Sequence, residues 1–357
     1  MEREKHNGEI AFWKFIYCLM IIALHFFSTM KFNGKFSFLG GSIGVEFFFV
    51  VSGYLLGKKA FTKSTFKNVG LETYNYMKNR IKKIFPTVFI ILVVSMVFYL
   101  STKKYYLYQI ANFVWDFLFL RNVGIKYYTL MYVGWYTSVL MISSLILYPM
   151  IIKWKDTFSY VIAPIIIIFI GGFIAYKWGN LCWDGEYYAK CFLRGFFEMS
   201  IGVFLYPFSI KIKSIKWTKF GKTVLSLIEY SGFILILVLV NRENFHNKYD
   251  FFALLILSIC ILIAFSRQSI IGRFLNNRVI FYLEKLSFPM FLGQGLVIDF
   301  CMRIYENVSN INIYVQLLYV ILVDALFASI CIWIVNHLPK YTKRIKAFFV
   351  EEDQYEK

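Results

Sequence analysis

The sequence contains little charge. Lys, Arg, Asp and Glu make up 17% of its 357 residues, whereas 59% are hydrophobic and 21% aromatic. A chain with so few polar side chains cannot cover a soluble globule, and it is too apolar to stay disordered. The composition therefore excludes a cytosolic domain and predicts a protein whose solvent is the lipid bilayer.

Several patterns that carry chemistry are also missing. The chain has no Cys-x-x-Cys pair, no P-loop, no Gly-x-Gly-x-x-Gly fingerprint and no histidine cluster with metal-ligand spacing. We therefore expect no bound metal. The first apolar stretch lacks a small-residue cleavage site, so we expect it to remain as a structural helix and not to be removed as a signal peptide.

Long apolar runs are what the chain has instead. A helix needs about 17–25 apolar residues to cross the hydrocarbon core. Runs of this kind cover residues 10–29, 40–57, 84–101, 131–152, 158–176, 192–209, 223–241, 249–266, 280–302 and 313–336. The ninth run is interrupted by polar residues, and the short stretch 105–120 reads as an interfacial or re-entrant helix. The prediction is an all-α, polytopic membrane protein with about ten transmembrane helices.

The distribution of basic residues sets the expected orientation. With the N-terminus inside, 26 of the 39 Lys and Arg residues fall on the inner side. The positive-inside rule then places both termini in the cytoplasm and the chain in the cell (inner) membrane as a multi-pass protein. Residues 1–340 form the expected transmembrane domain and residues 341–357 a charged cytoplasmic tail. The net charge of +18 thus reflects orientation and contact with membrane lipids, and we expect no nucleic acid partner.

Two of the six cysteines flank one predicted outer loop. Cys182 and Cys191 lie on either side of an acidic, aromatic segment. A disulfide between them is possible if that compartment is oxidising, and the sequence leaves the question open.

Ionisable residues inside a predicted span are candidates for function, because a charge in hydrocarbon is costly. His25 is the only histidine deep within a predicted span, and Lys14 precedes it by eleven residues. At 100° per residue the two side chains share one face of a helix, about 16 Å apart along its axis. The plain alternative is that Lys14 reaches to the cytoplasm and His25 is a satisfied interior imidazole.

The second run contains a carboxylate that needs a partner. Glu46 lies in the small-residue segment 40–53, which ends in Ser52 and Gly53. Small residues allow close helix packing, and the obvious partners for Glu46 are His25 or an arginine. The densest basic segment follows and includes Arg80, Lys82 and Lys83. It either sets topology or binds a phosphorylated ligand at the cytoplasmic side.

At this point the residues resemble a family, the acyltransferase-3 integral membrane acyltransferases. The basic residue ten positions before a histidine is present as Lys14 and His25, where the family more often has Arg. The family's Gly-Val-Asp-x-Phe-Phe-x-x-Ser-Gly element is similar to residues 44–53, with Glu46 in place of Asp.

Further matches follow in order along the chain. The Arg-x-x-Arg-x-x-Pro motif resembles Arg80, Lys83 and Pro86. The Trp-Tyr-x-Ser and Tyr-Pro elements are similar to Trp135, Tyr136, Ser138, Tyr148 and Pro149. Residues 193–202, which include Arg194, resemble the sixth-span pattern, and residues 286–292 resemble the ninth. The family commonly has a His after the ninth-span motif, whereas this chain has Gln294.

The resemblance implies acyl transfer across the membrane. Its donor would be cytoplasmic acyl-CoA, with acetyl-CoA expected, and its acceptor a hydroxyl of a cell-surface polysaccharide or a lipid-linked oligosaccharide. The implied catalytic residues are His25 as general base and Glu46 as its support. Donor binding would fall to Lys14, Arg80, Lys82 and Lys83, and substrate binding to Ser52, Trp135, Tyr136 and Arg194. Direct transfer and an acyl-His intermediate both remain open.

The competing hypothesis is a transporter of polysaccharide or lipid-linked sugar without acyl-transfer activity. Transporters frequently consist of two related halves. The second half of this chain shows no recurrence of the pattern formed by His25, Glu46 and Arg80.

Overall fold

The computed structural model describes residues 7–32, 34, 36–62, 68–102, 113–121, 130–182, 188–241, 249–305 and 311–355. Throughout these residues the regular structure is helical, which confirms the all-α prediction. The α-helices are α1 (Gly8–Thr29), α2 (Ile43–Phe61), α3 (Val69–Ser101), α5 (Phe113–Phe117), α6 (Gly134–Thr157), α7 (Ala163–Trp178), α8 (Tyr188–Ser214), α9 (Lys219–Leu239), α10 (Tyr249–Ser266), α11 (Arg278–Tyr305) and α12 (Ile313–Tyr355). Two short helices, η1 (Phe158–Ile162) and η2 (Ile271–Arg273), lie between them.

Seven stretches of the described chain are long and apolar enough to cross a membrane. They are Gly8–Thr29, Val69–Ser101, Gly134–Trp178, Ala189–Ser214, Lys219–Leu239, Tyr249–Ser266 and Ile313–His337. Helices also form over the other predicted runs, as α2 and α11, but charged residues such as Glu46 and Glu284 lower their hydropathy. Of the predicted interfacial segment 105–120, the structure describes only the part that contains α5; residues 105–112 lie outside the described residues.

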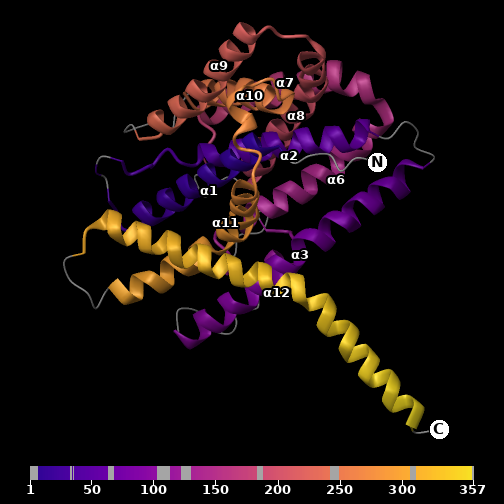
Figure 1. The fold of residues 1–357 in the computed structure, drawn as a ribbon, viewed down its shortest axis with the longest axis vertical. Coiled ribbons are helices and arrows are strands. Elements are labelled where there is room, and N and C mark those ends of the chain that lie inside the picture. Colours follow the sequence, from indigo (N-terminus) through magenta and orange to yellow (C-terminus); the bar gives the residue numbers. More distant parts are fainter. Residues whose placement is uncertain are drawn as a thin grey trace.

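The stretch Gly134–Trp178 contains two predicted runs. The helix breaks at Lys155, whose φ of 30° and ψ of −101° are not helical. After this turn the chain continues through η1 into α7 (Figure 1). The break accounts for the two separate runs predicted on either side of it.

The helices α1, α2 and α6 form the middle of the bundle (Figure 1). The helices α7, α9 and α10 gather on one side of them, and α3 and α12 on the other. One buried apolar cluster joins α1, α2, α3, α6, α11 and α12, and a second joins α1, α2, α8, α9 and α10. Because α1 and α2 contribute to both clusters, the residues they carry are held from two sides.

Close packing of α2 on α8 explains the small-residue segments. A Cβ atom added to Gly53 would lie 2.0 Å from the Met199 carbonyl oxygen, and one on Gly202 would lie 2.0 Å from the Val50 carbonyl oxygen. Neither position has space for a side chain. The two motif glycines therefore let the helix backbones touch.

The direction in which α11 runs relative to α1 constrains the number of membrane crossings between them. Lys14 contacts Glu284 and His25 contacts Gln294, so α1 and α11 run in the same direction. Two parallel spans require an odd number of crossings between them, and the ten-span order predicts seven. At the predicted boundary near residue 340 the backbone has no break, because α12 continues to Tyr355.

Candidate active site on α1, α6 and α11

His25 is paired with a residue of α11. Its Nδ1 lies 2.8 Å from Gln294 Oε1, and its ring meets the Tyr132 ring edge to face, with 4.9 Å between ring centroids. Gln294 is fully buried, and its side-chain nitrogen donates a hydrogen bond of 2.7 Å to the Phe291 carbonyl oxygen. His25 itself is half-buried. The imidazole is thus held at one nitrogen, while the residue as a whole stays partly accessible.

Lys14 also contacts α11, about three helical turns before His25 along α1. Its Nζ lies 2.7 Å from Glu284 Oε1, and each side chain is 21% exposed. Between the two levels, the Cys18 thiol approaches the Ser287 carbonyl oxygen at 3.2 Å. Both Lys14 and His25 therefore face one helix, as their eleven-residue spacing predicts.

The described contacts of Glu46 are with Arg194 and not with His25, so of the two partners that the sequence allowed the structure pairs it with an arginine. Its Oε1 accepts a hydrogen bond of 2.5 Å from Arg194, and Arg194 also lies 3.3 Å from Glu198 Oε1. The physical reason is helical geometry: Gly44 packs on Tyr17 and Ile21 of α1, and Glu46 lies about 200° further round α2, toward α8.

Arg194, expected to bind substrate, is likewise buried. The side chains of Glu46 and Arg194 are 1% and 2% exposed, and the guanidinium also donates to the Ser42 carbonyl oxygen and lies over the Trp135 ring. Trp135 is buried as well. In the structure these residues join α2, α6 and α8 rather than line an opening.

Ser52 and Tyr136, both expected to bind substrate, lie close together. Their hydroxyl oxygens lie 3.5 Å apart. The Tyr136 ring also meets the Phe291 ring edge to face at 5.2 Å, and the carbonyl group of Phe291 is the one that binds Gln294. A continuous set of contacts therefore connects Ser52 to His25 through Tyr136, Phe291 and Gln294.

Of the three predicted donor-binding residues in α3, Arg80 is the one with contacts that lead toward this set. Arg80 donates a hydrogen bond to the Tyr76 hydroxyl and lies over the Tyr76 ring, which stacks on Tyr148 of α6. Its charge is close enough to act on the Tyr136 hydroxyl. Lys82 and Lys83 are exposed.

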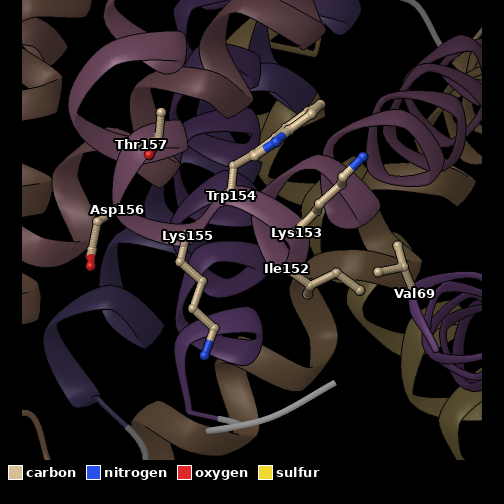
Figure 2. Close-up of a pocket in the computed structure, with 7 residues that line it drawn as sticks. All are labelled: Val69, Ile152, Lys153, Trp154, Lys155, Asp156 and Thr157. Carbon is tan, nitrogen blue, oxygen red and sulfur yellow. The ribbon is translucent and has the colours of Figure 1, made fainter. Parts of the chain in front are cut away.

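A separate pocket of about 470 Å³ lies where α6 ends, beside the start of α3 (Figure 2). Its lining residues are Val69, Ile152, Lys153, Trp154, Lys155, Asp156 and Thr157. Figure 2 shows Lys153 and Lys155 pointing to different sides of the turn. Their charges do not converge, and no predicted site residue lines this pocket.

The structure also bears on a disulfide and on metal binding. No disulfide is formed among the described cysteines of the structure. Among the described residues no group of His, Cys, Asp and Glu has an arrangement that could hold a metal ion.

Sequence reasoning did not single out Gln294, Glu284 or Tyr132 as site residues. Glu284 and Gln294 are visible in the sequence as interruptions of an apolar run. Because an ionised or strongly polar group in a span requires a partner, the pairing of these interruptions with Lys14 and His25 was the available signal.

The comparisons with known proteins agree with the resemblance seen in the motifs. No curated protein and no solved structure matches this chain. The model of the acyltransferase-3 family, described as an acyltransferase domain, matches residues 7–335 and so covers α1 to α11 and most of the described part of α12. The chain belongs to the acyltransferase-3 family of membrane acyltransferases.

Proposed function

We propose that this protein transfers an acyl group, acetyl in the simplest case, from cytoplasmic acyl-CoA to a hydroxyl of a cell-surface or lipid-linked polysaccharide. Membership of the family supports acyltransferase activity. The observation that carries the finer proposal is the placement of His25, which is half-buried within a span and bonded at only one ring nitrogen by the described residues. An imidazole held in this way is suited to proton transfer near neutral pH.

In the proposed reaction His25 acts as general base. Its Nε2 accepts the proton of the acceptor hydroxyl while the hydroxyl oxygen bonds to the thioester carbonyl carbon. The carbon–sulfur bond then breaks, and the imidazolium returns the proton to the departing CoA thiolate. The products are the acyl ester and CoA, and no further reactant is required.

The donor would reach His25 from the inner side. Arg80 is the cation that faces the contacts formed by Ser52 and Tyr136, so it is the residue we assign to an anionic part of the donor. Lys14 contributes less net charge than its sequence position suggests, because Glu284 is paired with it. Ser52 and Tyr136 would then line the path along which the thioester lies.

The proposal is tested by transfer of labelled acetyl from acetyl-CoA to glycan in membranes that contain the protein. His25→Ala should abolish incorporation at equal protein abundance, whereas His337→Ala should not, because the His337 ring bonds and stacks only on Trp333 of its own helix among the described contacts. Wild-type incorporation by His25→Ala would overturn the assignment. Glycan transport without any acetyl incorporation would favour the transporter hypothesis instead.

A further inference from the structure

The bond between His25 and Gln294 has only one satisfactory arrangement of protons. The amide of Gln294 has one accepting oxygen and one donating nitrogen, and the Phe291 carbonyl oxygen can only accept. The nitrogen must therefore face Phe291, at 2.7 Å, and the oxygen must face His25 Nδ1, at 2.8 Å. An oxygen at this distance can only accept, so Nδ1 carries the proton.

The reverse arrangement is disfavoured at two atoms. A rotated amide would place Gln294 Oε1 against the Phe291 carbonyl oxygen, with both atoms buried. A proton on Nε2 alone would leave the lone pair of Nδ1 against Oε1. Because Gln294 is fully buried, water cannot satisfy either misfit.

We propose that Gln294 is a positioning residue that fixes His25 in the tautomer with the proton on Nδ1 and so leaves the Nε2 lone pair as the base. The inference rests on the proposed function only for the role of the base; the tautomer follows from the contacts alone. Nε2 has no hydrogen-bond partner among the described residues. The ring therefore presents its lone pair on the side away from α11.

A neutral amide suits this task differently from a carboxylate. Gln294 Oε1 accepts a hydrogen bond from Nδ1–H both before and after Nε2 is protonated, so the ring keeps its orientation throughout the reaction. A glutamate would also accept the hydrogen bond from Nδ1–H, but its second oxygen would need a proton to donate to the Phe291 carbonyl oxygen as the amide nitrogen does. The matched pair of variants is therefore Gln294→Leu, which removes the acceptor, and Gln294→Glu, which retains it.

The test reads the tautomer directly. The full chain carrying histidine labelled with nitrogen-15 is studied by NMR, and the His25 signals are those that vanish in His25→Ala. The chain has four histidines, so this subtraction is practical. We expect wild type and Gln294→Glu to show the proton on Nδ1, and Gln294→Leu to shift the tautomer ratio toward Nε2–H by about tenfold or more. The control is Gln268→Leu, whose amide binds the Lys213 carbonyl oxygen and should change nothing.

Activity provides the second measurement. With labelled acetyl-CoA, Gln294→Leu should lower kcat by about tenfold or more with an unchanged KM for the donor. A wild-type His25 with its proton on Nε2 overturns the inference without any variant, and so does an unchanged tautomer in Gln294→Leu. If the tautomer result holds but no acetyl is transferred, the inference stands and the proposed function fails.

Discussion

Lys14 and Glu284 form an ion pair of 2.7 Å although 270 positions separate them in the sequence. The pair joins α1 to α11 on the face that carries His25 and Gln294 further along. Each partner retains 21% exposure, so neither charge is fully withdrawn from solvent. Because the ion pair joins α1 to α11, we expect it to fix the position of the two helices along each other.

Exchange of the two charges tests this role. Lys14→Glu alone places two carboxylates side by side, and Glu284→Lys alone places two ammonium groups side by side, so each should lower the yield of folded protein and acetyl transfer. The double variant should recover a large part of both, because the pair is restored. Lys213→Glu, at the end of α8, serves as the control for charge change alone. Losses that simply add in the double variant would show that the two residues do not interact.

The ion pair of Glu46 and Arg194 yields a different prediction. Both side chains are almost fully buried, and Glu46→Gln removes a charge-assisted hydrogen bond of Arg194, worth about 1.5–3 kcal/mol, while Glu198 remains as the other carboxylate partner of the guanidinium. Glu46→Gln should therefore lower the melting temperature of the purified protein markedly. The folded fraction should still transfer acetyl, since Glu46 is bonded to α8 and not to His25. A stable but inactive variant would restore Glu46 to the catalytic machinery.

The predicted helices follow from the bilayer itself, whereas the pairing of side chains does not. An apolar run must become a helix because lipid offers no partner for backbone groups, and each of the predicted runs is helical over most of its described length. The start of α3 was harder to predict from the sequence, because the basic residues before position 84 have the composition of a loop. In the structure Asn68 caps this helix through the Leu71 amide, and α3 begins at Val69.

The sequence could restrict the possible contact partners of each site residue but could not identify them. Periodicity places Lys14 and His25 on one face, but the face of α2 that Glu46 occupies depends on where Gly44 packs, and that depends on tertiary contact. The sequence allowed His25 or an arginine as the partner of Glu46, and the structure selects Arg194. The role of Gln294 could not be predicted from the sequence either, because the orientation of its amide depends on the hydrogen bond to the Phe291 carbonyl oxygen.

Close contact between α2 and α8 predicts intolerance of a single methyl group. Gly53→Ala would place a carbon 2.0 Å from a backbone oxygen of Met199, which cannot move aside as a side chain can. We expect a loss of about 1–3 kcal/mol in stability, or more if the helices separate. Gly172→Ala is the matched control, because nothing lies within 4 Å of its added methyl group. Equal melting temperatures for the two variants would mean that the helices are not in contact here.

The basic segment of α3 should divide into one functional and two dispensable cations. Arg80 lies against Tyr76 and within range of Tyr136, whereas Lys82 and Lys83 are exposed. Arg80→Gln should raise the KM for acetyl-CoA by about tenfold or more, because a charge-assisted contact to the donor is lost. Replacement of both Lys82 and Lys83 by Gln removes twice the charge but should leave that KM within about twofold, since exposed charges are screened by salt. Saturation curves for the donor at fixed glycan distinguish the variants. If the double lysine variant has the higher KM, the donor phosphates lie outside the bundle and not at Arg80.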